Sequence, residues 1–130
     1  MSRILIVEDE DFLRQVMEDN FISAGYAVDL ATDGEEAMEQ ISHKKPDLIL
    51  LDLLLPKKDG FYVLEEVKKS SEWGLIPIIV LSNLGQDTEI KKALEMGAND
   101  YFVKSQHPIQ EVVERVKDFL EGRSAAKKRV

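Results

Sequence analysis

An aspartate stands inside one of the most apolar stretches of the chain, DLILLDLLLPKKDG, which covers residues 47–60. Asp52 lies between the runs LILL and LLL. An isolated carboxylate in such surroundings costs far more free energy than folding returns, so its charge must be met by a hydrogen bond, an opposite charge or a metal ion. The partners of Asp52 must come from other parts of the chain.

Residues with useful chemistry also follow three other apolar runs. Glu8 and Asp9 follow RILIV, Ser82 follows PIIVL, and Lys104 follows DYFV. If these runs are parallel strands, their carboxyl ends meet at one edge of a sheet, which is where ligands bind in such folds.

Three acids gathered at that edge, Glu8, Asp9 and Asp52, would repel one another unless a cation lay among them. Carboxylate oxygens without thiol or imidazole groups favour a hard ion such as Mg²⁺. A carboxylate beside a metal ion, the Lys104 ammonium and the Ser82 hydroxyl is suited to hold a phosphoryl group, whose oxygens need neutralising during transfer.

Short apolar runs alternate with amphipathic stretches along the whole chain. The runs predict five strands, at residues 3–7, 27–31, 47–51, 77–81 and 100–103. The stretches predict five helices: one with the apolar stripe Leu13, Val16, Met17 and Phe21, three at residues 34–44, 61–70 and 88–96, and a last one containing residues 109–120. Gly25 and Gly97 are the expected stops of two of them.

Strict alternation of strands and helices predicts an α/β, doubly wound (βα)₅ three-layer sandwich with a five-stranded parallel sheet.

The composition indicates one domain, at residues 1–122, followed by a basic, flexible tail at residues 123–130 that could contact an acidic partner. The chain has no cysteine, which excludes disulfides and thiolate zinc sites. Its net charge of −8 argues against direct nucleic-acid binding. No run is long enough to span a membrane and no secretory signal is present, so we expect a cytoplasmic protein.

The fragments ILIVEDE, LLDLLLPKKDG, VLSN and DYFVK, taken in this order, resemble the receiver domain of two-component response regulators over residues 3–120. The resemblance implies a flavodoxin-like strand order of 2-1-3-4-5. It also implies a signalling phosphoacceptor rather than an enzyme acting on other substrates. We expect a stand-alone regulator, with a receiver cut from a longer chain as the alternative.

The resemblance assigns roles to individual residues. Asp52 matches the phosphoacceptor, Lys104 the site lysine and Ser82 the switch hydroxyl, while Tyr101 matches the aromatic switch. Mg²⁺, or alternatively Mn²⁺, would be held by Asp9, Asp52 and the backbone carbonyl of Leu54, with Glu8 acting through a water. The loop PKKDG would leave Asp52 open to solvent.

Partners are also implied by the resemblance. The phosphoryl donor would be a phosphohistidine on a sensor histidine kinase or a histidine phosphotransfer protein. Phosphorylation would reshape the surface formed by the fourth helix, fifth strand and fifth helix, which would control a downstream protein partner or a homodimer. No membrane partner is expected.

Several positions depart from the family pattern. Ser105 follows Lys104 where many members have proline in a cis peptide, and a cis bond here would cost about 3 to 4 kcal/mol, so the peptide geometry is open. Leu54 and Leu84 lie two residues beyond Asp52 and Ser82. Being apolar, they are expected to hinder attacking water and lengthen the phosphoryl lifetime.

Other interpretations remain open at the level of sequence. A pseudo-receiver would keep the fold without being phosphorylated. A haloacid-dehalogenase-type phosphatase also uses an aspartate and Mg²⁺ but normally carries a second acid where Leu54 stands. A flavin or nucleotide module would need a phosphate-binding loop in place of EDED. The acids of EDED could also serve to cap a helix, and Asp11 is the expected cap.

Overall fold

The computed structural model describes residues 1–121, and the predicted basic tail lies outside them. Strands and helices alternate throughout the described part. The strands are β1 (Arg3–Val7), β2 (Ala27–Ala31), β3 (Leu48–Leu51), β4 (Ile78–Ser82) and β5 (Asp100–Val103). The helices are α1 (Asp11–Ser23), α2 (Gly34–His43), α3 (Gly60–Lys69), α4 (Asp87–Glu95) and α5 (Ile109–Leu120).

The five strands form one parallel sheet in the order β2-β1-β3-β4-β5, which confirms the predicted fold and strand order. The register aligns the strand ends, since Val7 pairs with Leu51 and Ser82 pairs with Val103. The residues that follow these strands therefore leave the sheet at the same edge.

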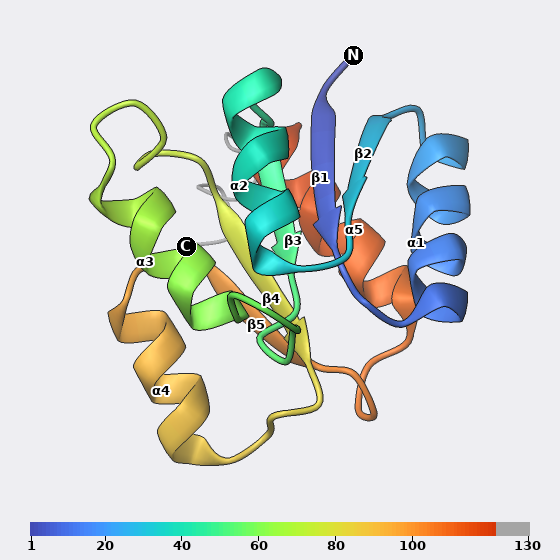
Figure 1. Cartoon of the computed structure of the whole chain (residues 1–130). Coiled ribbons are helices and arrows are strands. Elements are labelled where there is room, and N and C mark those ends of the chain that lie inside the picture. Colours follow the sequence, from blue (N-terminus) through green and yellow to red (C-terminus); the bar gives the residue numbers. More distant parts are fainter. Residues whose placement is uncertain (122–130) are drawn as a thin grey trace.

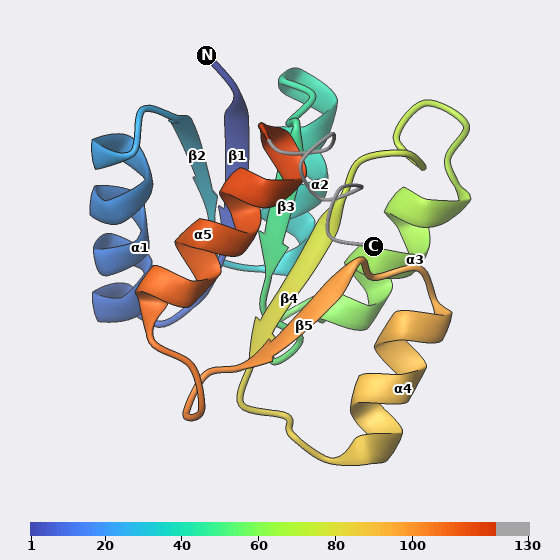
Figure 2. The same ribbon diagram turned by 180° about the vertical axis from the view of Figure 1, so that it is seen from behind.

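Two layers of helices cover the sheet, with α1 and α5 on one face and α2, α3 and α4 on the other (Figures 1 and 2). Alternate residues of each strand point to opposite faces, so each strand supplies both cores. In β1, for example, Ile4 and Ile6 pack with α1 and α5, whereas Leu5 and Val7 pack with α2 and α3. This explains why the central strands are apolar at nearly every position.

Helix ends agree with the sequence at some points and differ at others. Gly25 and Gly97 follow the last residues of α1 and α4 with φ angles of 98° and 110°, which confirms both predicted stops. The predicted cap at Asp11 is wrong: Glu10 is the residue that precedes α1, and its side chain makes no capping hydrogen bond. Asp11 lies in the first turn and pairs with Arg14 at 2.6 Å.

Strand β4 starts at Ile78 rather than at Pro77, because proline has no N–H to offer the sheet. The same strand continues through Ser82, one residue further than predicted. The Ser82 backbone is thus fixed by the sheet, which limits its movement to the side chain and the loop that follows.

At the opposite edge of the sheet, Lys68 holds the segment between α3 and β4. Its ammonium group donates to the carbonyl of Ile76 at 2.8 Å and to Oδ1 of Asn99 at 3.3 Å. Burial lowers the pKa of Lys68. Nearby Trp73 packs against the core, and its indole nitrogen is buried without a hydrogen-bond partner in the described part of the chain.

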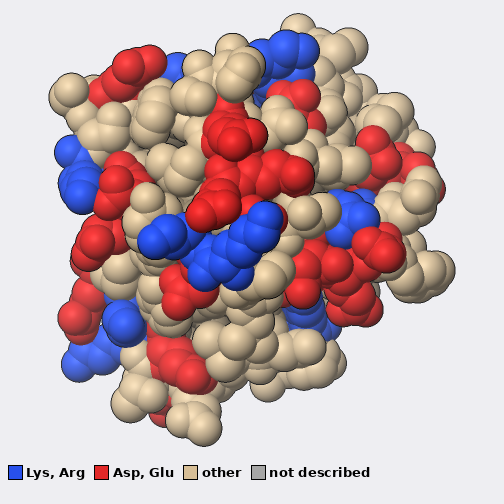
Figure 3. Space-filling model, in the orientation of Figure 1, with Lys and Arg blue, Asp and Glu red and all other residues tan. Residues whose placement is uncertain are grey.

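Acidic side chains are spread across the face shown in Figure 3, with basic ones among them. This distribution agrees with the net charge of −8 of the whole chain. Among residues 1–121, no helix is both long and apolar enough to cross a membrane.

Candidate functional site

Asp52 directly follows β3 and is held by contacts on three sides. Its backbone N–H donates to the carbonyl of Val7, and its Oδ1 accepts a hydrogen bond of 3.1 Å from the N–H of Leu54. Its Oδ2 lies 2.7 Å from Nζ of Lys104. Asp52 is only 3% exposed, so the expectation that the PKKDG loop leaves it open to solvent is wrong.

Lys104 comes from the end of β5 and is positioned by the sheet, because its backbone N–H donates to the carbonyl of Ser82 at 2.9 Å. Its ammonium group contacts Asp52 and also Oε1 of Glu8, at 2.8 Å. Burial by itself lowers the pKa of Lys104, but the hydrogen bonds to Asp52 and Glu8 outweigh it and leave the pKa raised. The lysine is therefore fully charged at neutral pH.

Glu8 is almost completely buried at the end of β1, and both of its carboxylate oxygens are engaged. Oε1 faces Lys104, and Oε2 accepts a hydrogen bond of 3.1 Å from the N–H of Glu10. Burial is the main reason why the pKa of Glu8 rises to about 6; the hydrogen bond from Lys104 opposes this rise, and the charge of Asp52 adds to it. Sequence reasoning missed the direct contact between Glu8 and Lys104.

Glu8, Asp9 and Asp52 each offer a carboxylate oxygen, and these oxygens all lie within 4.8 Å of one another. Asp9 is exposed, so the cluster can be reached from solvent. The carboxylates outnumber the single Lys104 ammonium by two negative charges, which suits a divalent ion. The described structure thus brings together the acids that the sequence predicted as metal ligands, with oxygen ligands alone.

Ser82 and Tyr101 lie on the neighbouring strands β4 and β5. Ser82 is fully buried, and its Oγ accepts a long hydrogen bond of 3.4 Å from the N–H of Leu84. The Tyr101 hydroxyl donates to the carbonyl of the same Leu84. Burial is the main cause that raises the pKa of Tyr101, with smaller contributions from Glu89 and Asp52. One loop residue therefore links the two side chains that the sequence predicted as switch residues.

The loop between β3 and α3, residues 52–59, carries Asp52 and forms one wall of the site. It is closed at its base by the N–H of Gly60, which donates to the carbonyl of Leu53 at 3.0 Å. Leu54 is 52% exposed on this loop. With Leu84, Phe61 and Asp59 it lines a shallow, mostly apolar hollow of about 380 Å³.

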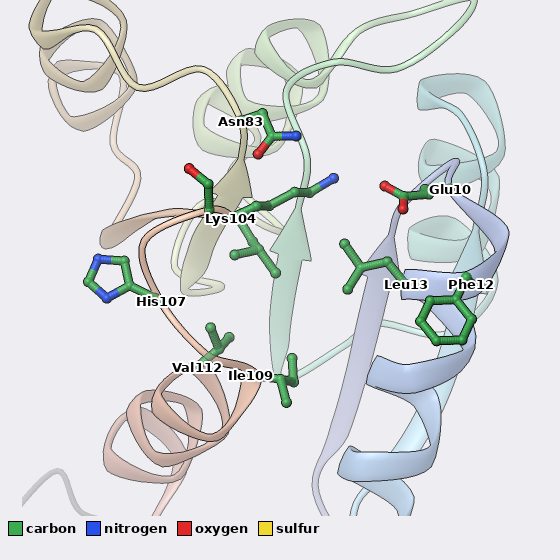
Figure 4. Close-up of a pocket in the computed structure, with 10 residues that line it drawn as sticks. Glu10, Phe12, Leu13, Asn83, Lys104, His107, Ile109 and Val112 are labelled. Atoms are coloured by element: carbon green, nitrogen blue, oxygen red, sulfur yellow. The ribbon is translucent and has the colours of Figure 1, made fainter.

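A second groove, of about 300 Å³, lies between the start of α1 and the segment that joins β5 to α5. Figure 4 shows Lys104 extending toward the space between Asn83 and Glu10 at one end of this groove, with Phe12 and His107 further along it. The described residues contain no cis peptide bond, so the Lys104–Ser105 bond, whose geometry the sequence left open, is trans.

Comparison with known proteins places this geometry in a family. The model of the response regulator receiver domain matches residues 4–117. The Guillardia theta protein named probable transcriptional regulator ycf27 is 39% identical over 119 residues, which are 92% of this chain and 45% of that protein. The chain thus spans about half the length of the curated relatives it matches.

Solved structures agree with the sequence comparison. The BeF₃-activated receiver domain of Klebsiella pneumoniae RstA has a TM-score of 0.84 and 31% identity, covering 92% of this chain and 98% of that one. The Mn²⁺-bound form of response regulator Rcp1 has a TM-score of 0.82 and 28% identity, covering 92% and 94%. The chain described here belongs to the response regulator receiver domain family, whose members are signalling phosphoacceptors.

Proposed function

We propose that this protein is a switch in which Asp52 accepts a phosphoryl group from a phosphohistidine, on a sensor histidine kinase or a histidine phosphotransfer protein. The contact that supports this proposal best is the 2.7 Å ion pair between Lys104 and Asp52 beside the carboxylate cluster. If Lys104 served only to neutralise Asp52, two further acids, Glu8 and Asp9, would not be needed beside the pair. Together the three acids are suited to bind a divalent ion, and a divalent ion is what phosphoryl transfer requires.

Asp9, Asp52 and the carbonyl of Leu54 would hold Mg²⁺, or Mn²⁺ in its place, with Glu8 contributing through a water. When bound, the ion neutralises charge on the phosphoryl oxygens. Glu8 is a weaker candidate for direct ligation, because its Oε1 already forms an ion pair with Lys104 and its Oε2 accepts a hydrogen bond from the backbone of Glu10. The residues present therefore fit the metal that the family uses.

In the transfer step, a carboxylate oxygen of Asp52 attacks the phosphorus of the phosphohistidine. The bond between phosphorus and nitrogen breaks, and the imidazole leaves with that electron pair. Lys104 then loses a carboxylate partner and gains a phosphoryl oxygen, while remaining paired with Glu8. Burial of Asp52 under Lys104 excludes bulk water from the nucleophile before the donor docks.

The signal would leave the site through Leu84. When the Ser82 side chain turns to donate its hydroxyl hydrogen to a phosphoryl oxygen, its Oγ moves away from the Leu84 N–H from which it accepts, and the loop between β4 and α4 moves. The Tyr101 hydroxyl is bonded to the same Leu84 and follows. The reshaped surface of α4, β5 and α5 would then control a downstream protein, or a second copy of this chain.

The proposal is tested by incubating the protein with acetyl phosphate and Mg²⁺ and measuring its intact mass. We expect a mass increase of one phosphoryl group in the wild type and none in Asp52→Asn or in EDTA. Asp52→Asn keeps the size of the side chain, so its circular dichroism serves as the folding control. A folded wild type that gains no mass would instead favour a pseudo-receiver, and turnover of a generic phosphomonoester would favour a phosphatase.

A further inference from the structure

The loop between β3 and α3 is pressed from outside by the first turn of α2. At Gly34, the first residue of α2, an added Cβ atom would lie 1.9 Å from the carbonyl oxygen of Lys58. Real Cβ atoms essentially never approach a neighbour more closely than 3.0 Å. Any side chain at Gly34 therefore requires that either α2 or the loop moves.

The first turn of α2 is the less movable of the two segments. Asp33 accepts a hydrogen bond of 2.8 Å from the N–H of Glu36, and the Glu36 carboxylate in turn accepts one of 2.7 Å from the N–H of Thr32. These paired contacts fix the start of the helix. Ala37, one turn further on, is fully buried against the sheet.

The loop is the more movable segment, and its shape depends on the contact with α2. Pro56, Lys57 and Lys58 are exposed. Lys57 has a φ of 60°, a left-handed conformation that no other non-glycine residue of the described chain adopts. Its ammonium group lies 3.7 Å from the carboxylate of Asp33, so α2 contacts the loop both through the helix backbone and through a charge.

A displacement at Lys58 cannot be absorbed at the base of the loop. The hydrogen bond from Gly60 to Leu53 closes that base, and an added Cβ atom at Gly60 would lie 2.3 Å from the carbonyl oxygen of Asp52. The strain must therefore be taken up between the two ends of the loop, where the Leu54 backbone contacts Asp52.

We propose that Gly34 is a positioning residue for the phosphoacceptor site: its missing side chain lets α2 set the place of the β3–α3 loop, and thereby the affinity of the site for Mg²⁺. This inference rests on the proposed function, because it takes Asp52 and the Leu54 carbonyl as ligands of the ion. It assigns to a residue outside the carboxylate cluster a role in preparing that cluster.

The test compares Gly34→Ala with a matched control, Gly74→Ala, by calorimetric titration with Mg²⁺. At Gly74, on the opposite edge of the sheet, an added Cβ atom would lie 2.6 Å from the carbonyl oxygen of Ser70, so both variants force a backbone shift. We expect Gly34→Ala to weaken Mg²⁺ binding about 10-fold, a typical effect of altering the support of a metal ligand. Gly74→Ala should bind Mg²⁺ as the wild type does, even where its melting temperature falls.

A second measurement on the wild type decides the matter if Gly34→Ala does not fold. Coupling between two sites is reciprocal, so Mg²⁺ should slow hydrogen exchange at the N–H of Glu36 in α2. The N–H of Gly74, bonded to Ser70, should exchange at an unchanged rate. An unchanged rate at Glu36 overturns the inference.

The two levels of the proposal fail in different ways. Wild-type Mg²⁺ affinity in a folded Gly34→Ala variant overturns the role of Gly34 alone. A wild-type protein that binds no Mg²⁺, or binds it equally well as Asp52→Asn, overturns the proposed function and this inference together.

Discussion

Lys104 and Lys68 lie at opposite edges of the same sheet and have opposite electrostatic surroundings. Lys104 contacts two carboxylates, which raise its pKa in spite of burial. Lys68 contacts backbone carbonyls and an amide, and burial lowers its pKa. A carboxylate can be converted to an acyl phosphate, which changes the local charge. A peptide carbonyl is neutral and undergoes no such reaction. If the proposed phosphorylation occurs, the edge with Asp52 changes its electrostatic state, whereas the contacts of Lys68 hold the segment between α3 and β4.

The largest expected effect, on the rate of phosphorylation, comes from removing the Lys104 ammonium group beside Asp52. Lys104→Met should slow phosphate incorporation from acetyl phosphate about 100-fold, the usual size of losing one charge-stabilising group. Intact mass at timed intervals measures the rate. Lys68→Met is the matched control and should incorporate phosphate at the wild-type rate, because it lies at the other edge. Similar rates of phosphate incorporation in Lys104→Met and Lys68→Met would show that Lys104 has no special role in the reaction.

The pH dependence of stability should report the burial of Glu8. Its pKa is about 6 in the folded chain, against an ordinary value of 4.5, so the unfolded chain releases this proton first as pH rises. The stability gained from protonated Glu8 is full below pH 4.5 and is lost as pH passes 6, by about 2 kcal/mol. Urea unfolding in EDTA at several pH values measures this change.

Glu8→Gln provides the control for that experiment, since glutamine does not titrate. The stability of the wild type minus that of Glu8→Gln should fall between pH 4.5 and 6. A difference that stays constant over this range would show that Glu8 is less buried or more strongly paired than the structure indicates.

At the edge of the sheet opposite to Asp52, Lys68→Met should lower the free energy of unfolding by about 1 kcal/mol, because the carbonyl of Ile76 loses its hydrogen-bond donor. Thermal unfolding measures this loss. Lys69→Met is the neighbouring control: Lys69 is exposed and forms a surface ion pair with Glu66. Equal melting temperatures in the two variants would mean that the half-buried amine of Lys68 contributes nothing to the fold.

The smallest expected effect concerns the lifetime of the phosphoryl group. Leu54→Asn introduces a polar side chain beside Asp52 and should speed loss of phosphate a few-fold, by about 1 kcal/mol or less in activation free energy. Leu75→Asn, at a fully exposed leucine between α3 and β4, is the control. Loss of phosphate from Leu54→Asn at the wild-type rate would show that Leu54 does not hinder water.

Sequence patterns predicted the elements and their order because the strands are short apolar runs and the sheet is parallel. The same reasoning predicted that Glu8, Asp9, Asp52, Ser82 and Lys104 leave the sheet at one edge, since each follows or ends a strand. These expectations depend on the spacing of apolar residues and on the alternation of strands and helices. Both can be read from the sequence without knowing where the loops lie.

The sequence did not predict contacts that depend on where loops lie in space. The closure of Lys104 over Asp52, which buries the aspartate, requires the length and direction of both side chains. The approach of Gly34 to Lys58 joins the start of α2 to a loop residue 24 positions later by a contact between backbones. A glycine after an aspartate reads as an ordinary helix start, and no pattern distinguishes it from a glycine required by a neighbour.

The location of Trp73 has a practical consequence for spectroscopy. It is the only tryptophan in the chain, and it lies between α3 and β4, at the edge of the sheet opposite to Asp52. Its intrinsic fluorescence should follow denaturation faithfully and remain nearly silent when Asp52 is modified. An optical sensor of signalling would have to carry its fluorophore elsewhere, on the surface of α4 or in the loop that precedes it.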